Sequence, residues 1–330
     1  MTTDIWTIKS ALDWTAGYLE RKGDDSPLLS AQWLLSEATG LSRIELYVNY
    51  DRPLTMDERD LLRGYVTRRG RGEPLQYITG EVGFRHITVK VRPGVLIPRP
   101  ETEVLVSEVL AALPSAERPR SAEFMADLMG EFDQADVDSS AEVDGSNACL
   151  SGDSANDGKL LVADICTGSG CIACSLAYEH ASIRAVATDI SDIAVGLARE
   201  NVSQLALEDR VEVLHGDLGF CISEELMGCF DAVVSNPPYV PTSVMDEIPE
   251  EVANYEPALA LDGGEDGLDL FRRLLPWTYE ALKSGGVFAC ELHETCLDDA
   301  AQLAREGGFV NVRIVYDLTQ RPRVLTAVRP

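Results

Sequence analysis

The chain has 330 residues, and its 55 acidic side chains outweigh 28 Lys and Arg to give a formal net charge of −27 at pH 7. So large a negative charge excludes a broad electrostatic grip on nucleic acid, whose phosphates are held by Lys and Arg. No apolar stretch approaches the roughly 18 residues of a membrane span, and the first residues lack a signal sequence. The length is typical of two domains, and we expect a monomeric cytoplasmic protein without nucleic-acid or membrane partners.

The cysteines do not form a metal-binding or disulfide pattern. Cys171 and Cys174 make one C-x-x-C pair, but no second pair follows at zinc spacing, and the chain has only 4 His. We therefore expect small buried thiols in a reducing compartment and no metal site.

Residues 1–73 have the pattern of a small helical bundle. Helix start signals recur along this segment, namely a Ser before a Pro at the first helical position and two capping-box pairs. These signals are Ser26-Pro27, Ser42 with Glu45, and Thr55 with Glu58. Trp6, Trp14 and Trp33 are expected in the core of the bundle, and no catalytic pattern occurs within it.

Residues 74–100 are expected to link the bundle to the rest of the chain. Within them, residues 82–84 and 87–91 alternate in a way that predicts a β-hairpin. Basic residues outnumber acidic ones between Arg63 and Arg99. On so acidic a protein this stretch is either a partner-binding surface or a solvated face.

Residues 101–330 form the third segment, and an insertion interrupts it. A helix is predicted at 104–113, and the acidic insertion covers residues 115–158. From 121 to 158 there are ten Asp and Glu but no Lys or Arg. Because like charges repel and apolar residues are sparse there, we expect the insertion to be disordered.

From Lys159 onward, segments typical of strands alternate with helical ones. The predicted strands are residues 160–165, 183–188, 211–214, 230–235 and 286–291, followed by a closing pair at 312–316 and 324–328. Such alternation predicts an α/β fold with a doubly wound, seven-stranded sheet.

A rigid loop, Asn236-Pro237-Pro238-Tyr239, follows the fourth of these strands. The two prolines prevent further strand or helix, and the carboxyl ends of strands are where open α/β sheets bind ligands. Asn236 offers one acceptor and two donors, and Tyr239 offers a flat ring, which together suit a planar NH2 group. The alternative is a strand-ending turn with a buried tyrosine.

A glycine-rich turn, Cys166-Thr167-Gly168-Ser169-Gly170, follows the first strand, and Asp189 ends the second. Glycine lets the backbone approach a ligand closely, and an acidic residue about twenty positions later can accept both hydroxyls of a ribose. No P-loop lysine follows, so a triphosphate fits poorly and S-adenosylmethionine fits well. Asp217, after the third strand, either accepts the adenine amino group or caps a turn.

In combination, these motifs resemble the class I S-adenosylmethionine-dependent amino-methyltransferases, which have a Rossmann-like sheet. Residues 73–80, 96–103 and 255–261 narrow the resemblance to the peptide chain release factor glutamine methyltransferase family, and the resemblance covers nearly the whole chain except the acidic insertion. It implies methylation of the side-chain amide nitrogen (N5) of the glutamine in the Gly-Gly-Gln motif of class I release factors. It also implies that residues 1–73 recognise the substrate.

The resemblance implies a role for each motif residue. The residues expected to bind the cofactor are Cys166, Thr167, Gly168, Ser169, Gly170, Asp189, Asp217, Leu218 and Asn236. The residues expected to hold the glutamine are Asn236, Pro237, Pro238 and Tyr239, with Asn236, Pro237 and Tyr239 as the catalytic set. Arg99 and Glu103, with Glu101, are expected to order the entrance or bind the backbone of the partner. Two positions depart from the family pattern, His293 in place of a glycine and Leu218 in place of an aromatic residue.

A mechanism follows for the glutamine amide, whose nitrogen is a poor nucleophile because its lone pair is delocalised into the carbonyl. We expect the side-chain oxygen of Asn236 and the carbonyl of Pro237 to accept its two N–H bonds, while Tyr239 packs on the amide plane. Positioning and acceptor dipoles would then supply most of the rate enhancement without a general base.

Three other functions remain as alternatives. A related glutamine methyltransferase branch acts on a ribosomal protein, although its loop usually lacks the continuation seen at residues 100–103. An adenine-N6 DNA methyltransferase uses the same loop on a flipped base, but the negative charge and the missing target-recognition domain oppose it. A non-enzymatic adaptor would require a damaged transfer loop.

Overall fold

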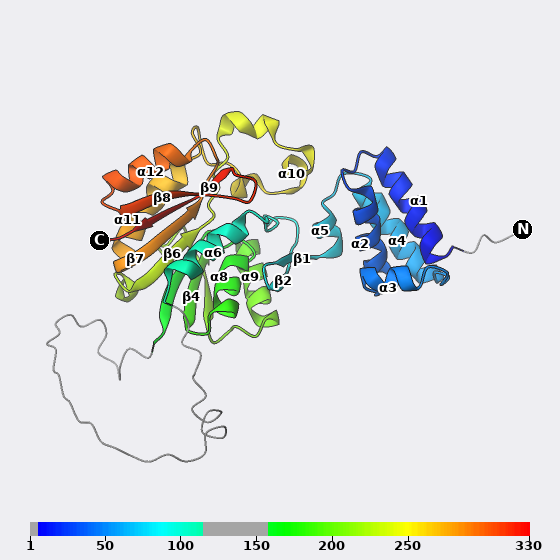
Figure 1. The fold of residues 1–330 in the computed structure, drawn as a ribbon, viewed down its shortest axis with the longest axis horizontal. Coiled ribbons are helices and arrows are strands. Elements are labelled where there is room, and N and C mark those ends of the chain that lie inside the picture. The colour runs from blue at the N-terminus through cyan, green and yellow to red at the C-terminus, as the bar shows by residue number, and fades with distance from the viewer. Residues whose placement is uncertain (1–5, 115–157) are drawn as a thin grey trace, which may run out of the picture.

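The computed structural model describes residues 6–114 and 158–330, which form a helical bundle and a larger α/β lobe (Figure 1). The acidic insertion predicted at residues 115–158 lies outside the described residues, except for Gly158. No helix among the described residues is long and apolar enough to cross a bilayer.

The helical bundle contains the predicted caps. Its helices are α1 (Ile8–Arg21), α2 (Pro27–Thr39), α3 (Arg43–Val48) and α4 (Met56–Arg69), and a short α5 (Leu75–Thr79) follows. The capping boxes of Ser42 and Thr55 are both formed, whereas the side chain of Ser26 makes no capping hydrogen bond although Pro27 starts α2. A further capping box, at Thr7, was not predicted.

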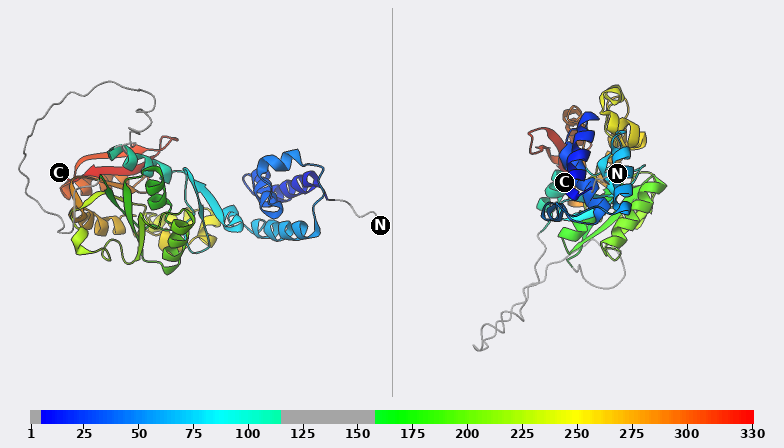
Figure 2. Two further views of the ribbon diagram at one scale, coloured as in Figure 1. Left: turned by 90° about the horizontal axis from the view of Figure 1, so that it is seen from below. Right: turned by 90° about the vertical axis from the view of Figure 1, so that its right-hand side faces the viewer.

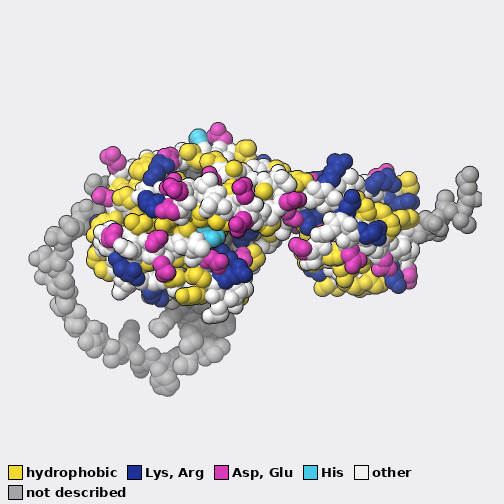
Figure 3. Space-filling view, turned by 90° about the horizontal axis from the view of Figure 1, so that it is seen from above, with side chains coloured by type: hydrophobic (Ala, Val, Ile, Leu, Met, Phe, Trp, Pro, Cys, Tyr) yellow, Lys and Arg dark blue, Asp and Glu magenta, His cyan; other side chains and the backbone are white. Residues whose placement is uncertain are grey.

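The prediction that the tryptophans form the core of the bundle is wrong for two of them. Trp14 is 48% exposed and Trp33 is 42% exposed, and the buried core consists of aliphatic side chains instead. Trp14 stacks on Tyr18 with ring centroids 5.4 Å apart. The bundle therefore shows hydrophobic side chains beside Lys and Arg on its surface (Figure 3).

The predicted hairpin is present as β1 (Glu81–Phe84) and β2 (Ile87–Lys90), paired antiparallel. It lies between the bundle and the α/β lobe (Figure 2). The side chain of Asn201 accepts a hydrogen bond from the Lys90 N–H at 2.7 Å and donates to its carbonyl at 3.1 Å, which attaches the hairpin to the lobe.

Many side chains of the basic stretch form ion pairs within the protein. The pairs are Arg63–Asp60, Arg68–Glu73, Arg69–Asp24, Arg69–Glu251, Arg85–Glu179, Lys90–Glu200, Arg92–Glu200 and Arg99–Glu256. The local excess of positive charge thus connects segments of the chain to one another.

The sheet has seven strands in the order β5-β4-β3-β6-β7-β9-β8. The strands are β3 (Leu160–Ile165), β4 (Ile183–Asp189), β5 (Val211–His215), β6 (Phe230–Ser235), β7 (Leu282–Glu291), β8 (Val310–Tyr316) and β9 (Pro322–Val328). The first five strands of that order pair in parallel, and β9 pairs antiparallel with both β7 and β8. The predicted doubly wound α/β fold is confirmed, although β7 begins four residues before the predicted residue 286. The predicted domain boundaries stay predictions.

Helices cover both faces of the sheet because its strands alternate apolar side chains between the faces. One face packs against α6 (Thr102–Ala112), α8 (Cys171–Glu179) and α9 (Asp192–Gln204). The other packs against α11 (Asp269–Ala281) and α12 (Leu297–Glu306). The remaining elements are α10 (Glu250–Tyr255) and the short 3-10 turns η1 (Glu224–Leu226), η2 (Thr242–Glu247) and η3 (Ala258–Ala260). Parallel strands between two helical layers leave their carboxyl ends open to a ligand.

The thiols of six described cysteines are free, namely those of Cys166, Cys171, Cys174, Cys221, Cys290 and Cys296. Cys171, Cys174, Cys290 and Cys296 are buried as predicted, whereas Cys221 is exposed.

Candidate functional site

A pocket of about 470 Å³ opens at the carboxyl ends of β3, β4 and β6. It brings together most of the residues expected from the sequence, namely Arg99, Cys166, Thr167, Gly168, Ser169, Asp189, Asp217, Leu218, Asn236 and Pro238. Gly170, Pro237, Tyr239 and Glu103 do not line it. The structure therefore assembles one site from segments that are far apart in the sequence.

The glycine-rich turn is held rigidly below the pocket. The Thr167 N–H donates to the carbonyl of Thr188 at 2.9 Å, and the Thr167 hydroxyl donates to the buried carboxylate of Asp164 at 2.6 Å. Gly170 has φ +80° and caps α8, and a Cβ there would lie 3.1 Å from the Cβ of Ala198. Gly170 thus permits the close packing of α8 on α9 instead of facing a ligand.

Asp189 forms the wall of the pocket beside the turn. One of its oxygens accepts the Gly168 N–H and the other accepts the Ser191 N–H, each at 2.9 Å. Burial raises the pKa of Asp189, and these backbone bonds oppose that effect. The two bonds fix the carboxylate at the end of β4, and each oxygen keeps a lone pair for a ligand hydroxyl.

The third strand end contributes Asp217 and Leu218. Asp217 forms an ion pair with Arg273 of α11, which also lines the pocket and was not predicted from the sequence. Leu218 is 4% exposed and has φ +49°, an uncommon value for a branched residue. An aliphatic side chain therefore stands where the family pattern has an aromatic one.

The amide of Asn236 has one satisfied end and one free end. Its Nδ2 donates to the Thr102 hydroxyl oxygen at 3.3 Å, whereas its Oδ1 is buried and makes no hydrogen bond among the described residues. A buried acceptor without a partner costs free energy of about 1–3 kcal/mol unless a ligand satisfies it. One residue of the pocket lining thus carries an unpaired acceptor, and it is the residue that the sequence predicted to bind the amide that is methylated.

Glu291 lies behind this amide at the end of β7. It is 1% exposed, and its Oε1 accepts the hydroxyl of Tyr239 at 2.9 Å. Its Oε2 is buried and makes no hydrogen bond among the described residues. Burial raises the pKa of Glu291, and the neighbouring side chains of Thr102 and Tyr239 oppose the rise. Sequence reasoning missed both Thr102 and Glu291, although Thr102 lies in one of the family motifs and Glu291 ends a predicted strand.

The remaining predicted residues have structural partners. Arg99 pairs with Glu256, a carboxylate whose side chain is 1% exposed. Glu103 accepts the Arg85 N–H at 3.1 Å and so faces the hairpin. Pro237 is buried. Tyr239 is half-buried, and its side chain packs on the core between the sheet and the helices α11 and α12.

Among residues 6–114 and 158–330, no group of three or more His, Cys, Asp or Glu side chains is arranged to hold a metal ion.

Comparison with known proteins matches both parts of the chain. Residues 10–80 match the family described as the PrmC N-terminal domain, and residues 129–255 match the methyltransferase small domain. The release factor glutamine methyltransferase of Geobacter sulfurreducens is 38% identical over 289 residues, which are 88% of this chain and 85% of that protein. Proteins of the same name are 36% identical in Caulobacter vibrioides, over 98% of this chain and 97% of that protein, and 34% identical in Rhodopirellula baltica, over 97% and 96%.

Proposed function

This chain belongs to the release factor glutamine methyltransferase family, and we propose that it transfers a methyl group from S-adenosyl-L-methionine to the side-chain amide nitrogen of the glutamine in the Gly-Gly-Gln motif of class I release factors. The observation that carries the proposal is the buried, unpaired Oδ1 of Asn236, a residue that lines the pocket. Because the proposed substrate is a protein of translation termination, we expect the reaction to take place in the cytoplasm.

The donor set of the pocket fits S-adenosyl-L-methionine. Asp189 presents a fixed carboxylate for the ribose hydroxyls, and Gly168 keeps the turn free of a side chain beside it. Asp217 and Leu218 line the part of the pocket where the adenine would lie. When bound, this cofactor supplies an electrophilic methyl group on a sulfonium centre.

The neighbours of Asn236 account for the orientation of its amide. Glu291 accepts the hydroxyl proton of Tyr239, and the nearby Thr102 side chain favours the ionised form of this carboxylate. The Thr102 oxygen in turn accepts a hydrogen bond from the NH2 group of Asn236. The other end of the amide, Oδ1, is left for the substrate.

The residues of this chain then act on the substrate amide by binding and orientation. Oδ1 of Asn236 would accept one of its N–H bonds, and the carbonyl of Pro237, which becomes an acceptor only if the substrate reaches beyond the pocket lining, would accept the other. These bonds would draw the nitrogen lone pair out of conjugation. Transfer would form the new N–C bond, leave the electron pair of the broken S–C bond on sulfur, and release one N–H proton to solvent. Pre-oriented acceptor dipoles typically contribute a few kcal/mol to such a step.

The proposal is tested by incubating the protein with methyl-labelled S-adenosyl-L-methionine and each of four substrates. The substrates are a class I release factor, the same factor with the tripeptide glutamine replaced by alanine, ribosomal proteins, and DNA. We expect label on the intact factor alone. Label on the alanine factor, on a ribosomal protein or on DNA would contradict the proposal.

A further inference from the structure

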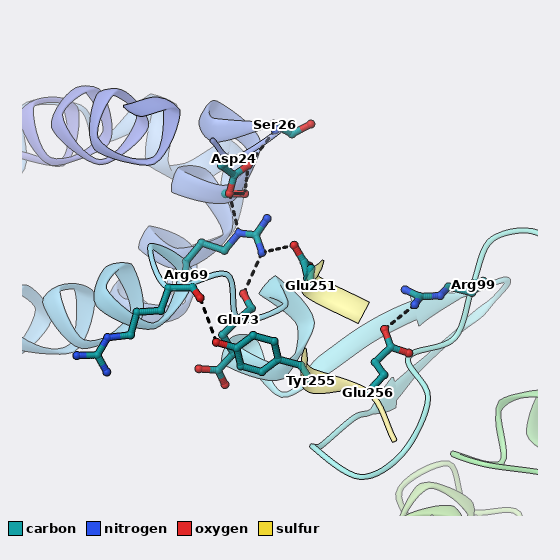
Figure 4. Close-up of polar contacts among 10 residues, drawn as sticks. Asp24, Ser26, Arg69, Glu73, Arg99, Glu251, Tyr255 and Glu256 are labelled. Atoms are coloured by element: carbon teal, nitrogen blue, oxygen red, sulfur yellow. Dashed lines mark hydrogen bonds and ion pairs between the residues drawn. The ribbon is translucent and has the colours of Figure 1, made fainter. Parts of the chain in front are cut away.

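Arg69 joins three segments of the chain at the junction between the helical bundle and the α/β lobe (Figure 4). Its side chain is 12% exposed, and its Nε donates to Asp24 in the loop after α1 at 2.6 Å. Its Nη1 donates to the carbonyl of Glu73 at 2.9 Å and to the carboxylate of Glu251 in α10 at 2.8 Å. One guanidinium therefore holds two parts of the bundle and one helix of the α/β lobe.

The ion pairs of Arg69 are anchored inside the bundle. The Asp24 side chain is 4% exposed, and it also accepts hydrogen bonds from Ser26 and Ser30. Burial by itself raises the pKa of Asp24, but the bonds from Arg69 and the two serines lower it overall, so the carboxylate is ionised. Arg69 is thereby fixed in place, with its Nη1 directed at Glu251 of α10.

The segment that begins with α10 continues from this junction to the pocket. The Tyr255 hydroxyl donates to the carbonyl of Arg71 in the bundle at 3.2 Å. The next residue, Glu256, pairs with Arg99 on the pocket wall, and Leu259 and Ala260 line the pocket a few residues later. Ten residues thus connect the bundle directly to the site.

This connection is separate from the covalent link. Along the chain, the bundle joins the α/β lobe through α5 and the hairpin of β1 and β2 (Figure 2). A single linker of that kind acts as a hinge, whereas a second contact at another point fixes the orientation of the two parts. The contacts of α10 with Arg69 and Arg71 supply that second point.

We propose that Arg69 is a positioning residue which, through Glu251, fixes the bundle relative to Asn236, so that a protein docked on the bundle presents its glutamine at the correct distance. The inference rests on the proposed function. A bundle free to swing would lower the effective concentration of the docked glutamine at the pocket, whereas a short peptide that occupies only the pocket would not be affected.

The test uses the full-length Glu251→Gln/Tyr255→Phe variant, which removes the negative charge that pairs with Arg69 and the hydroxyl that bonds to the Arg71 carbonyl, and leaves the Asp24–Arg69 pair intact. Glu250→Gln is the matched control, because it removes one negative charge from the same exposed turn, and no contact with the bundle is described for Glu250. We expect kcat/KM on an intact release factor to fall about tenfold in the double variant and to be unchanged in the control. Turnover of a short Gly-Gly-Gln peptide and the Kd of the cofactor should not change.

A second measurement follows the distance between the bundle and the α/β lobe and does not depend on catalysis. Spin labels on α2 and α12 should give a broader distance distribution in the double variant than in the wild type or in Glu250→Gln. An unchanged distribution, or equal losses on protein and peptide substrates, would overturn the role of Arg69. Wild-type enzyme that leaves the release factor unmethylated would instead contradict the proposed function itself.

Discussion

The hydroxyl of Tyr239 donates to Glu291 across 2.9 Å, and this carboxylate is buried behind the loop that carries Asn236. The loop is therefore attached at its far end to a carboxylate that does not line the pocket. Thr102 lies beside the same carboxylate and accepts a hydrogen bond from the amide of Asn236. We therefore expect the orientation of this amide to depend on Glu291.

Glu291→Gln should lower kcat while leaving the Kd of the cofactor unchanged. The new amide can donate as well as accept, so the Thr102 hydroxyl is no longer required to act as an acceptor for Asn236. We expect a loss of about ten- to a hundredfold in kcat, measured by steady-state methylation of the release factor. Thr102→Ser keeps the hydroxyl and should retain activity, whereas Thr102→Val should behave like Glu291→Gln. Normal turnover in Thr102→Val would show that the hydrogen bond from Asn236 to Thr102 does not orient the amide for catalysis.

Asn236→Ala should retain cofactor binding and lose most turnover. The change removes the vacant acceptor, so kcat should fall by about 10²–10³-fold, the usual cost of one preorganised dipole. Isothermal titration with S-adenosyl-L-methionine and single-turnover methylation separate the two effects. Turnover at the wild-type rate would show that Asn236 does not accept the substrate amide.

Asp189→Asn should act on the cofactor and not on the chemical step. Charge-assisted hydrogen bonds contribute about 1.5–3 kcal/mol each, so the Kd should rise at least about tenfold. At saturating cofactor, kcat should approach that of the wild type. A lower kcat at saturation, with an unchanged Kd, would place Asp189 in a different role.

Asp164 makes stability depend on pH. Burial raises its pKa from 3.8 to about 7 despite the bonds from Thr167 and Ala173, so the folded chain keeps a proton that the unfolded chain releases between about pH 4 and 7. The stability of the wild type should therefore fall as pH rises through this window, by at most about 1.4 kcal/mol per pH unit from this group. Denaturant unfolding at pH 5 and pH 7 should show a smaller fall for Asp164→Asn. If the free energy of unfolding fell equally with pH in both proteins, the raised pKa of Asp164 would be contradicted.

Two serine and threonine caps of the bundle should differ although they look alike in the sequence. The side chain of Thr55 accepts the Glu58 N–H, whereas that of Ser26 makes no capping bond. Thr55→Ala should destabilise the protein by about 1 kcal/mol. Ser26→Ala is the matched control and should be nearly neutral. Thermal unfolding of both variants, followed by circular dichroism, provides the comparison.

The sequence was sufficient to predict the strands and the residues at their carboxyl ends. Strand positions follow from β-branched runs and from the turn residues after them, so the turn at Gly168 and the loop at Asn236 could be placed at one edge of the sheet. Local pattern could not show that Tyr239 faces Glu291, 52 residues later, since that contact depends on which strands become neighbours.

The tryptophans show a second limit of sequence reasoning. Size and apolarity predicted Trp14 and Trp33 in the core, but the helices bury aliphatic residues and leave these rings on the surface. Helical periodicity identifies an apolar face without telling whether another helix covers all of it. The contacts of Arg69 were equally inaccessible, because its partner Glu251 comes from a distant part of the chain.

The acidic insertion leaves the described chain at Pro114, after α6, and the chain resumes at Gly158, before β3. The carbonyl of Pro114 lies 2.9 Å from the ring Nε2 of His180. Both points lie at the amino end of β3, whereas the pocket lies at the carboxyl ends of the strands. Changes of length between Pro114 and Gly158 should therefore leave catalysis intact, which makes this position suitable for attaching a fluorophore or an affinity handle to the working enzyme.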